Sequence, residues 1–129
     1  MKRLCIIMRN IIFAAALCII LSAVVCLLLQ IKPAIVVSGS MEPEIHTGSL
    51  VFIDMKKTEA EVGDIIAFEK GSIFVTHRIE KITEEGYITK GDANKTADMG
   101  VVTDDAVIGT ALFSIPYVGY FIRTLSIRL

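Results

Sequence analysis

Residues 38–43, Ser-Gly-Ser-Met-Glu-Pro, are the part of this sequence most able to do chemistry. Ser40 lies between a glycine and a methionine, and Pro43 closes a turn after it. A serine hydroxyl is a weak nucleophile unless a neighbouring group takes its proton. Histidine most often serves as such a base. The chain has two histidines, His46 and His77, and either could be the base that activates Ser40.

His77 is the better placed of the two. The run Ile73–Ile82 alternates as a strand does, and a period of two puts His77 on its apolar face. A histidine there is often only a hydrogen-bonded core residue, but a desolvated imidazole beside a serine is also how such a nucleophile gains its base. His46 lies in a turn only six residues after Ser40, and we expect it at the surface.

A histidine base needs a carboxylate that fixes its tautomer and stabilises the imidazolium. Asp92 and Asp98 both follow His77 in turn-like segments, and the residues alone do not separate these two candidates. Ser38, two residues before Ser40, offers a second hydroxyl. Together with the Ser40 backbone N–H, it could form an oxyanion hole for a tetrahedral intermediate.

A membrane-length apolar segment precedes these residues and must position them. Residues 11–29 include one polar residue, Ser22, and as a helix they would be roughly 28 Å long, close to the hydrocarbon thickness of a bilayer. This is too long for the apolar part of a cleaved signal peptide, so we expect an uncleaved anchor. Lys2, Arg3 and Arg9 precede it, which predicts a cytosolic N-terminus with the rest of the chain outside.

The composition excludes several classes of protein. The chain has 129 residues, enough for one anchor and one small domain. Residues 31–129 carry ten basic and fourteen acidic residues, a net charge of −4, so we expect no nucleic-acid partner. Cys5, Cys18 and Cys26 all lie in the first 26 residues, which leaves no disulfide framework for the external domain. Two separated histidines make no metal-ligand set, and we expect no metal or other cofactor.

After the anchor, short apolar runs alternate with turn signals, which predicts a mainly-β domain. No amphipathic helix is expected outside the anchor. The predicted strands are Ile35–Val37, Ser49–Ile53, Asp64–Glu69, Ile73–Ile82, Tyr87–Lys90 and Ala106–Phe113. The predicted organisation is a basic cytosolic segment (1–10), a transmembrane anchor (11–30), an extracytoplasmic β catalytic domain (31–113) and an interfacial C-terminal segment (114–129).

The C-terminal segment raises the question of a second membrane span, because residues 106–122 carry no charge. Gly109, Pro116 and Gly119 interrupt this stretch, and proline in a helix interior removes a hydrogen bond. Its first half is better used as a closing strand of the β domain. Aromatic residues and two flanking arginines follow, as is typical of a membrane interface. We therefore expect residues 114–129 to lie along the outer membrane surface.

Residues 38–43, 63–68, 76–79 and 90–98, in this order after an anchor, resemble the sequence boxes of type I signal peptidases, which cut signal peptides from exported proteins. The common bacterial branch has a lysine where this chain has His77, whereas a histidine there is like the archaeal and endoplasmic-reticulum branch. The resemblance implies Ser40 as nucleophile, His77 as base and Asp98 as the third catalytic residue. It also implies that Asp92 is required, in a structural role.

The same resemblance implies a coiled β-sheet fold lying against the membrane, and a single-pass protein of the cell membrane. Its substrates would be membrane-anchored precursor proteins with signal peptides. The substrate would bind as an added strand, with small side chains at the first and third positions before the cut. In many relatives the stretch beginning at Ile115 leads into a second membrane helix. Here the chain stops nine residues after Tyr120, which puts that second helix in doubt.

Two alternatives stay open at the level of sequence. The first is a serine–lysine protease of the same fold, with Lys81 or Lys90 as the base; Lys81 shares the face of His77 by period two. The second is a membrane-anchored β domain that binds or assembles partners without turnover. The presence of a serine, a histidine and an aspartate in the expected order argues against this second alternative.

Overall fold

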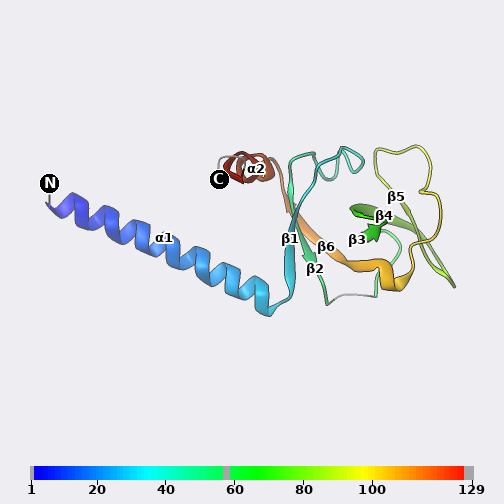
Figure 1. Ribbon diagram of the computed structural model, residues 1–129, viewed down its shortest axis with the longest axis horizontal. Coiled ribbons are helices and arrows are strands. Elements are labelled where there is room, and N and C mark those ends of the chain that lie inside the picture. The colour runs from blue at the N-terminus through cyan, green and yellow to red at the C-terminus, as the bar shows by residue number, and fades with distance from the viewer. Residues whose placement is uncertain (1, 57–58, 127–129) are drawn as a thin grey trace.

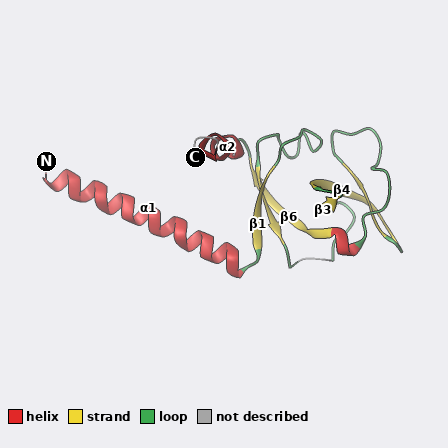
Figure 2. Cartoon of the chain, viewed as in Figure 1, coloured by secondary structure: helices red, strands yellow, loops and turns green. Residues whose placement is uncertain are grey.

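The computed structural model describes residues 2–56 and 59–126. Two helices flank a single β-sheet, and a 3-10 turn precedes the last strand. The elements are α1 (Lys2–Leu28), β1 (Ile31–Ile35), β2 (Leu50–Asp54), β3 (Ile65–Lys70), β4 (Ile73–Thr83), β5 (Gly86–Lys90), η1 (Asp104–Ala106), β6 (Val107–Ile115) and α2 (Val118–Ser126). Both helices lie on the same side of the sheet, and α1 projects away from the domain as a rod (Figures 1 and 2).

Helix α1 is long and apolar enough, by length and composition, to cross a membrane. Its segment Arg3–Leu28 has a mean hydropathy of 3.1, and none of it is buried against the rest of the protein. The hydroxyl of Ser22 donates a hydrogen bond of 2.8 Å to the carbonyl of Ile19. The one polar side chain of residues 11–29 is therefore satisfied within the helix, as an apolar surrounding requires. The helix begins well before residue 11, so the basic N-terminal segment is helical too.

The six strands form one antiparallel sheet in the order β1-β2-β6-β3-β4-β5. This sheet must curl. In a flat sheet the four steps from β1 to β4 would separate these strands by roughly 19 Å, yet the Lys32 ammonium on β1 lies 5.3 Å from the centre of the Phe74 ring on β4. Three strand pairs contain a register shift, and such bulges bend the strands that carry them.

Two apolar clusters hold the curled sheet together. The first joins β3, β4 and β5, and the second packs the segment that follows Ser40 against β2 and β3. The buried members of the first are Ala60, Ile66, Phe68, Ile79, Tyr87 and Val102, and those of the second are Met41, Ile45, Val51, Ile53 and Ala67. The segment that carries Ser40 is thus fixed by the core on one side.

The prediction of a mainly-β domain after an N-terminal helix is confirmed, and five of the six expected strands lie within two residues of their predicted bounds. The predicted bounds of the first strand were wrong, because this strand runs over Ile31–Ile35 rather than Ile35–Val37. Pro33 is tolerated in β1 because β1 is an edge strand, where a missing N–H can face away from the ladder. Val36 continues the pairing, since its N–H donates to the carbonyl of Ser49 at 2.9 Å.

The expectation of no helix beyond the anchor is also wrong, because Val118–Ser126 forms α2. Apolar residues do recur at a helical period in this segment, but it is only nine residues long, and Gly119 in its first turn weakens the helical propensity. The glycine is required by packing, since an added Cβ would lie 2.7 Å from the carbonyl oxygen of Gly48. Residues 127–129, which belong to the predicted interfacial segment, lie outside the described residues.

Candidate active site

The segment carrying Ser40 is held by its neighbours in the chain. Met41 and Ile45 are 1% and 3% exposed, and the N–H of Ile45 donates to the carbonyl of Met41 at 2.9 Å, closing one helical turn. The N–H of Glu42 donates to the carbonyl of Gly39 at 3.1 Å, so the backbone turns tightly around Ser40. The buried side chains of Met41 and Ile45 on one side, and the hydrogen-bonded turn on the other, leave Ser40 little freedom to move.

His77 lies in the middle of β4 and is 7% exposed, as its place on the apolar face predicted. The edge of its ring meets Phe68 on β3, with ring centroids 6.3 Å apart and an interplanar angle of 70°. The antiparallel register of β3 and β4 places Ile66 directly opposite His77. Apolar neighbours therefore fix the plane of the imidazole, and each of its two nitrogens faces a polar side chain.

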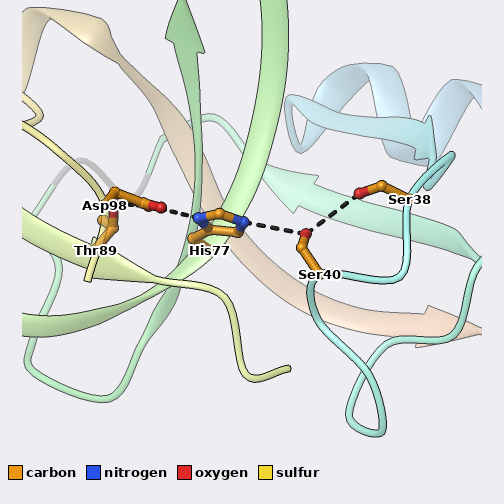
Figure 3. Close-up of polar contacts among 5 residues, drawn as sticks. All are labelled: Ser38, Ser40, His77, Thr89 and Asp98. Carbon is orange, nitrogen blue, oxygen red and sulfur yellow. Dashed lines mark hydrogen bonds and ion pairs between the residues drawn. The ribbon is translucent and has the colours of Figure 1, made fainter. Parts of the chain in front are cut away.

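Asp98, His77 and Ser40 form a continuous line of hydrogen bonds (Figure 3). The Nδ1 atom of His77 lies 2.5 Å from Oδ2 of Asp98, and its Nε2 atom lies 3.1 Å from Oγ of Ser40. An ionised carboxylate only accepts hydrogen bonds, so Nδ1 carries the hydrogen and Nε2 presents its lone pair to the serine. This is the tautomer that can take a proton from Ser40.

Thr89, which the sequence did not single out, holds Asp98 in place. Its fully buried hydroxyl donates to Oδ2 of Asp98 at 2.7 Å, and its carbonyl accepts the backbone N–H of Asp98 at 2.8 Å. Burial works against ionisation of Asp98, but the hydrogen bonds from His77 and Thr89 outweigh it, and the pKa of Asp98 lies below its ordinary value. The carboxylate is thus charged at neutral pH and aimed at the imidazole.

The structure separates Asp92 from Asp98, which the residue types alone could not do, and the aspartate that it places beside His77 is the one that the resemblance implied. Asp92 faces the guanidinium of Arg78, which donates from Nε to Oδ1 at 2.9 Å and from Nη2 to Oδ2 at 2.6 Å. The Nη1 atom of Arg78 donates to the carbonyl of Gly63 at 2.8 Å. The hydrogen bond from Arg78 lowers the pKa of Asp92, and the same bond raises the pKa of Arg78. Asp92 therefore joins two loops through Arg78 and makes no hydrogen bond to His77.

We predict that Asp92→Asn lowers stability in a pH-dependent way. The folded-state pKa of Asp92 is depressed, so its contribution is fully present above the unfolded pKa, near 3.9, and is lost as pH falls through the lower folded value. The Arg78 side chain is 35% exposed, so solvent screening limits the loss to roughly 1 kcal/mol at pH 7. Thermal unfolding of the detergent-solubilised chain at pH 7 and pH 3 should show the difference shrinking with acid. An equal or larger difference at pH 3 would contradict the assignment.

Gly91 brings the turn of residues 91–94 against the serine. A Cβ on Gly91 would lie 2.5 Å from the carbonyl oxygen of Ser40 and 3.0 Å from Nε2 of His77, so no other residue fits without displacing them. The same carbonyl of Ser40 accepts the N–H of Ala93 at 2.9 Å. The glycine thus has a packing role at the site, which the sequence alone did not reveal.

Ser38 lies beside Ser40, as the sequence suggested. Its Oγ is 3.3 Å from Oγ of Ser40 (Figure 3). The Ser38 hydroxyl thus lies close to any carbonyl that Ser40 would attack, and the second donor that the sequence suggested is the backbone N–H of Ser40 itself. A pair of donors of this kind can stabilise the negative charge of a tetrahedral intermediate.

A groove of about 660 Å³ runs from Ser40 and His77 along the inner side of the curled sheet. Its walls come from β1 and the residues after it, from β3 and from the first half of β4. Most of the lining side chains are apolar, and Lys32 over Phe74 also borders the groove. Lys70, a residue that the sequence did not single out, also lines it. A groove of this shape and lining suits an extended apolar segment of a polypeptide.

The two lysines considered as alternative bases lie elsewhere. A bulge between Ile79 and Lys81 breaks the period of β4, so Lys81 does not share the face of His77 and is exposed. Lys90 lies 3.5 Å from Glu80 across the β4–β5 pair. His46, the other histidine, stacks on Tyr117 with ring centroids 5.8 Å apart. The side-chain partners of the Ser40 hydroxyl in the described part of the chain are His77 and Ser38.

Comparison with known proteins places the chain among peptidases. Residues 32–111 match the model of the S24-like peptidase family. Signal peptidase I W of Bacillus subtilis (strain 168) is 46% identical over 81 residues, which are 56% of this chain and 42% of that protein. The signal peptidase complex catalytic subunit SEC11C of Homo sapiens is 34% identical over 100 residues, 66% of this chain and 52% of that protein. The chain thus spans about half the length of these curated relatives.

Proposed function

Because the chain belongs to the S24-like peptidase family and is a member of the type I signal peptidase family, we propose that it is a membrane-bound serine endopeptidase that removes signal peptides from precursor proteins. The observation that carries this proposal is the line from Asp98 through His77 to Ser40 at the end of an apolar groove. The curled sheet then corresponds to the coiled β-sheet of signal peptidases.

In the first half of the proposed reaction, Ser40 Oγ attacks the carbonyl carbon of the scissile bond while its proton moves to Nε2 of His77. Asp98 stays ionised and stabilises the imidazolium through Nδ1. The tetrahedral oxyanion accepts hydrogen bonds from the Ser38 hydroxyl and the Ser40 backbone N–H. When the carbon–nitrogen bond breaks, His77 gives its proton to the leaving amine. The mature protein departs, and the signal peptide remains as an ester on Ser40.

In the second half, a water molecule takes the place of the amine. It attacks the ester carbonyl while His77 Nε2 accepts one of its protons. The ester bond to Ser40 then breaks, and His77 returns the proton to the serine oxygen. The cleaved signal peptide leaves with a new carboxylate, and His77 and Ser40 are restored to their starting protonation states.

The groove supplies the substrate site in this proposal. The residues before the cut would lie in it as an extended segment, with backbone pairing of the kind that adds a strand. A strand advances about 3.3 Å per residue with alternate side chains on one face, so the first and third residues before the cut share the wall near His77. The resemblance to signal peptidases implies small side chains at those two positions, next to the wall that Met41 and Ala67 line.

The direct test is processing of precursors. The chain should be co-expressed with a panel of tagged precursors in a host freed of its own signal peptidases, and the products should be identified by N-terminal sequencing. Discrete cleavage after the apolar part of the signal peptide is expected. A properly inserted and folded protein that cleaves no member of the panel, and is not labelled at Ser40 by an acylating inhibitor, would instead favour the non-catalytic binding module.

We further propose that α1 is the anchor, with the N-terminus in the cytosol and the β domain outside. Supporting this arrangement, α2 lies on the same side of the sheet as α1 (Figure 1). The surface there is apolar: Phe113 on β6 and Tyr117, Tyr120 and Phe121 at α2 are all about half exposed or more. Residues 114–126 of the expected interfacial segment would rest on the outer leaflet.

Cysteine labelling can test this topology, because Met99 is 91% exposed. In intact cells, Met99→Cys should react with a membrane-impermeant reagent added from outside. The native Cys5, near the expected cytosolic end of α1, provides the control and should react only after permeabilisation. Labelling of Met99→Cys only after permeabilisation would reverse the proposed orientation.

A further inference from the structure

Helix α2 contacts the loop that carries Ser40, although about eighty residues separate them in the sequence. The N–H of Gly119 donates to the carbonyl of Gly48 at 2.9 Å, and a Cβ on Gly48 would lie 2.1 Å from the Tyr120 ring. Two glycines thus allow a close approach of backbone to backbone. The rings of Tyr117 and His46 stack beside this contact at an interplanar angle of 8°.

The same part of the loop is tied to the turn around Ser40. Thr47 lies between the two residues that α2 contacts, and it donates to Oε1 of Glu42 from its hydroxyl at 3.1 Å and from its backbone N–H at 3.3 Å. Glu42 in turn donates its N–H to the carbonyl of Gly39. The bonds from Thr47 hold the pKa of Glu42 below its ordinary value, so the carboxylate is charged at neutral pH.

We propose that α2 and Glu42 form a clamp that positions the nucleophile: α2 fixes residues 46–48, and Thr47 and Glu42 pass that placement to the turn that holds Ser40. The clamp consists of the Gly48–Gly119 contact, the His46–Tyr117 stack and the Glu42–Thr47 bonds. None of these residues touches the reacting atoms, so they are positioning residues. The inference rests on the proposed peptidase function, because it assigns their role to the rate of attack by Ser40.

The physical reason for a clamp lies in how the loop is otherwise fixed. Met41 and Ile45 pack its core side, Ala93 binds the Ser40 carbonyl, and the N–H of Gly48 donates to the carbonyl of Val36 at 2.8 Å. Helix α2 adds a second support on the side of residues 46–48, through the contacts of Gly119 and Tyr117. The Ser40 hydroxyl already lies 3.1 Å from Nε2 of His77, at the long end of a good hydrogen bond. A further shift of about 1 Å in such a contact can cost roughly a hundredfold in rate.

The test uses the full chain in detergent and a short soluble peptide that contains a cleavage site, so that membrane anchoring of the substrate plays no part. Gly119→Ala, Tyr117→Ala and Glu42→Ala each break one contact of the clamp. Their kcat is expected to fall by roughly tenfold to a hundredfold, while KM stays within about twofold and thermal unfolding shows an intact sheet. Tyr117→Phe keeps the stack and Glu42→Gln keeps an acceptor oxygen, so both should restore most of kcat.

Glu44→Ala is the matched control, because it removes an exposed carboxylate from the same loop that is not bonded to Thr47. The double variant Gly119→Ala/Glu42→Ala should lose less than the sum of the two single losses, since both break one chain of contacts. If Gly119→Ala does not fold, the comparison of Tyr117→Ala with Tyr117→Phe decides.

Two outcomes would overturn the clamp while leaving the peptidase function intact: an unchanged kcat in all three alanine variants, or a change confined to KM. A loss of kcat in Glu44→Ala equal to that in Glu42→Ala would also overturn it. The loss of kcat would then come from removing a negative charge from the loop, and not from breaking the Glu42–Thr47 hydrogen bonds. Failure of the wild-type chain to cleave any peptide or precursor would count against the proposed function itself.

Discussion

Ser40→Ala and His77→Ala are each expected to abolish processing while the protein still inserts and folds. The hydroxyl and the imidazole act as one unit, since Nε2 of His77 lies 3.1 Å from the serine oxygen. In a well-studied serine protease, loss of either partner costs on the order of a millionfold in kcat. Both variants should be assayed with purified protein against a precursor, by the appearance of the mature N-terminus.

A matched serine variant controls for effects on folding. Among the described residues, the Ser49 hydroxyl has no hydrogen-bond partner although it is fully buried. Removing an unsatisfied buried hydroxyl leaves the remaining contacts in place, so Ser49→Ala should be as active as the wild type and at least as stable. Clear cleavage by Ser40→Ala, in a preparation free of other peptidases, would end the proposed mechanism.

Asp98→Asn is expected to cost roughly ten-thousandfold in kcat, as does loss of the orienting aspartate in the best-known serine protease. The amide has no charge to stabilise the imidazolium, and its NH₂ group can hold His77 in the wrong tautomer. The fold should survive, because the substitution leaves the backbone N–H of this position bonded to the Thr89 carbonyl, at 2.8 Å in the wild type. Kinetics with purified protein and circular dichroism would separate loss of catalysis from loss of structure.

The pH dependence follows from the lowered pKa of Asp98. Its charge, and the stability that its bonds to His77 and Thr89 provide, are present above the unfolded pKa of about 3.9 and are lost only as pH falls through the lower folded value. Protonation of Asp98 therefore does not limit activity at or above about pH 5. An active Asp98→Asn protein together with a folded but inactive Asp92→Asn protein would show that the two aspartates have exchanged roles.

Local patterns in the sequence were enough to predict most of the secondary-structure elements and the main chemical groups of the candidate site. An uninterrupted apolar run predicts α1, because a membrane-length helix needs only composition and length. Period-two alternation predicts β4 and the burial of His77, since successive side chains of a strand point to opposite faces. Ser40 stood out by its place in a glycine- and proline-bounded turn, and the order of the motifs indicated the family.

Tertiary structure alone decided which groups meet. Asp92 and Asp98 are equivalent in the sequence, and they differ because Arg78 binds one and Thr89 places the other against His77. A bulge after Ile79 removed Lys81 from the face that strict alternation had given it. Such contacts join residues far apart in the chain, and no local period reports them.

The same reason explains the groove and α2. The groove needs β1 and β4 to approach across a sheet in which three other strands lie between them, and that curl depends on bulges whose positions the sequence does not show. Helix α2 is only nine residues long, and the contact that holds it comes from Gly48, about seventy residues earlier, which no local pattern shows. The sequence by itself therefore determined the long apolar helix, most of the strands and the candidate reactive side chains, whereas the alignment of Ser40, His77 and Asp98 came from long-range packing, which local propensity cannot encode.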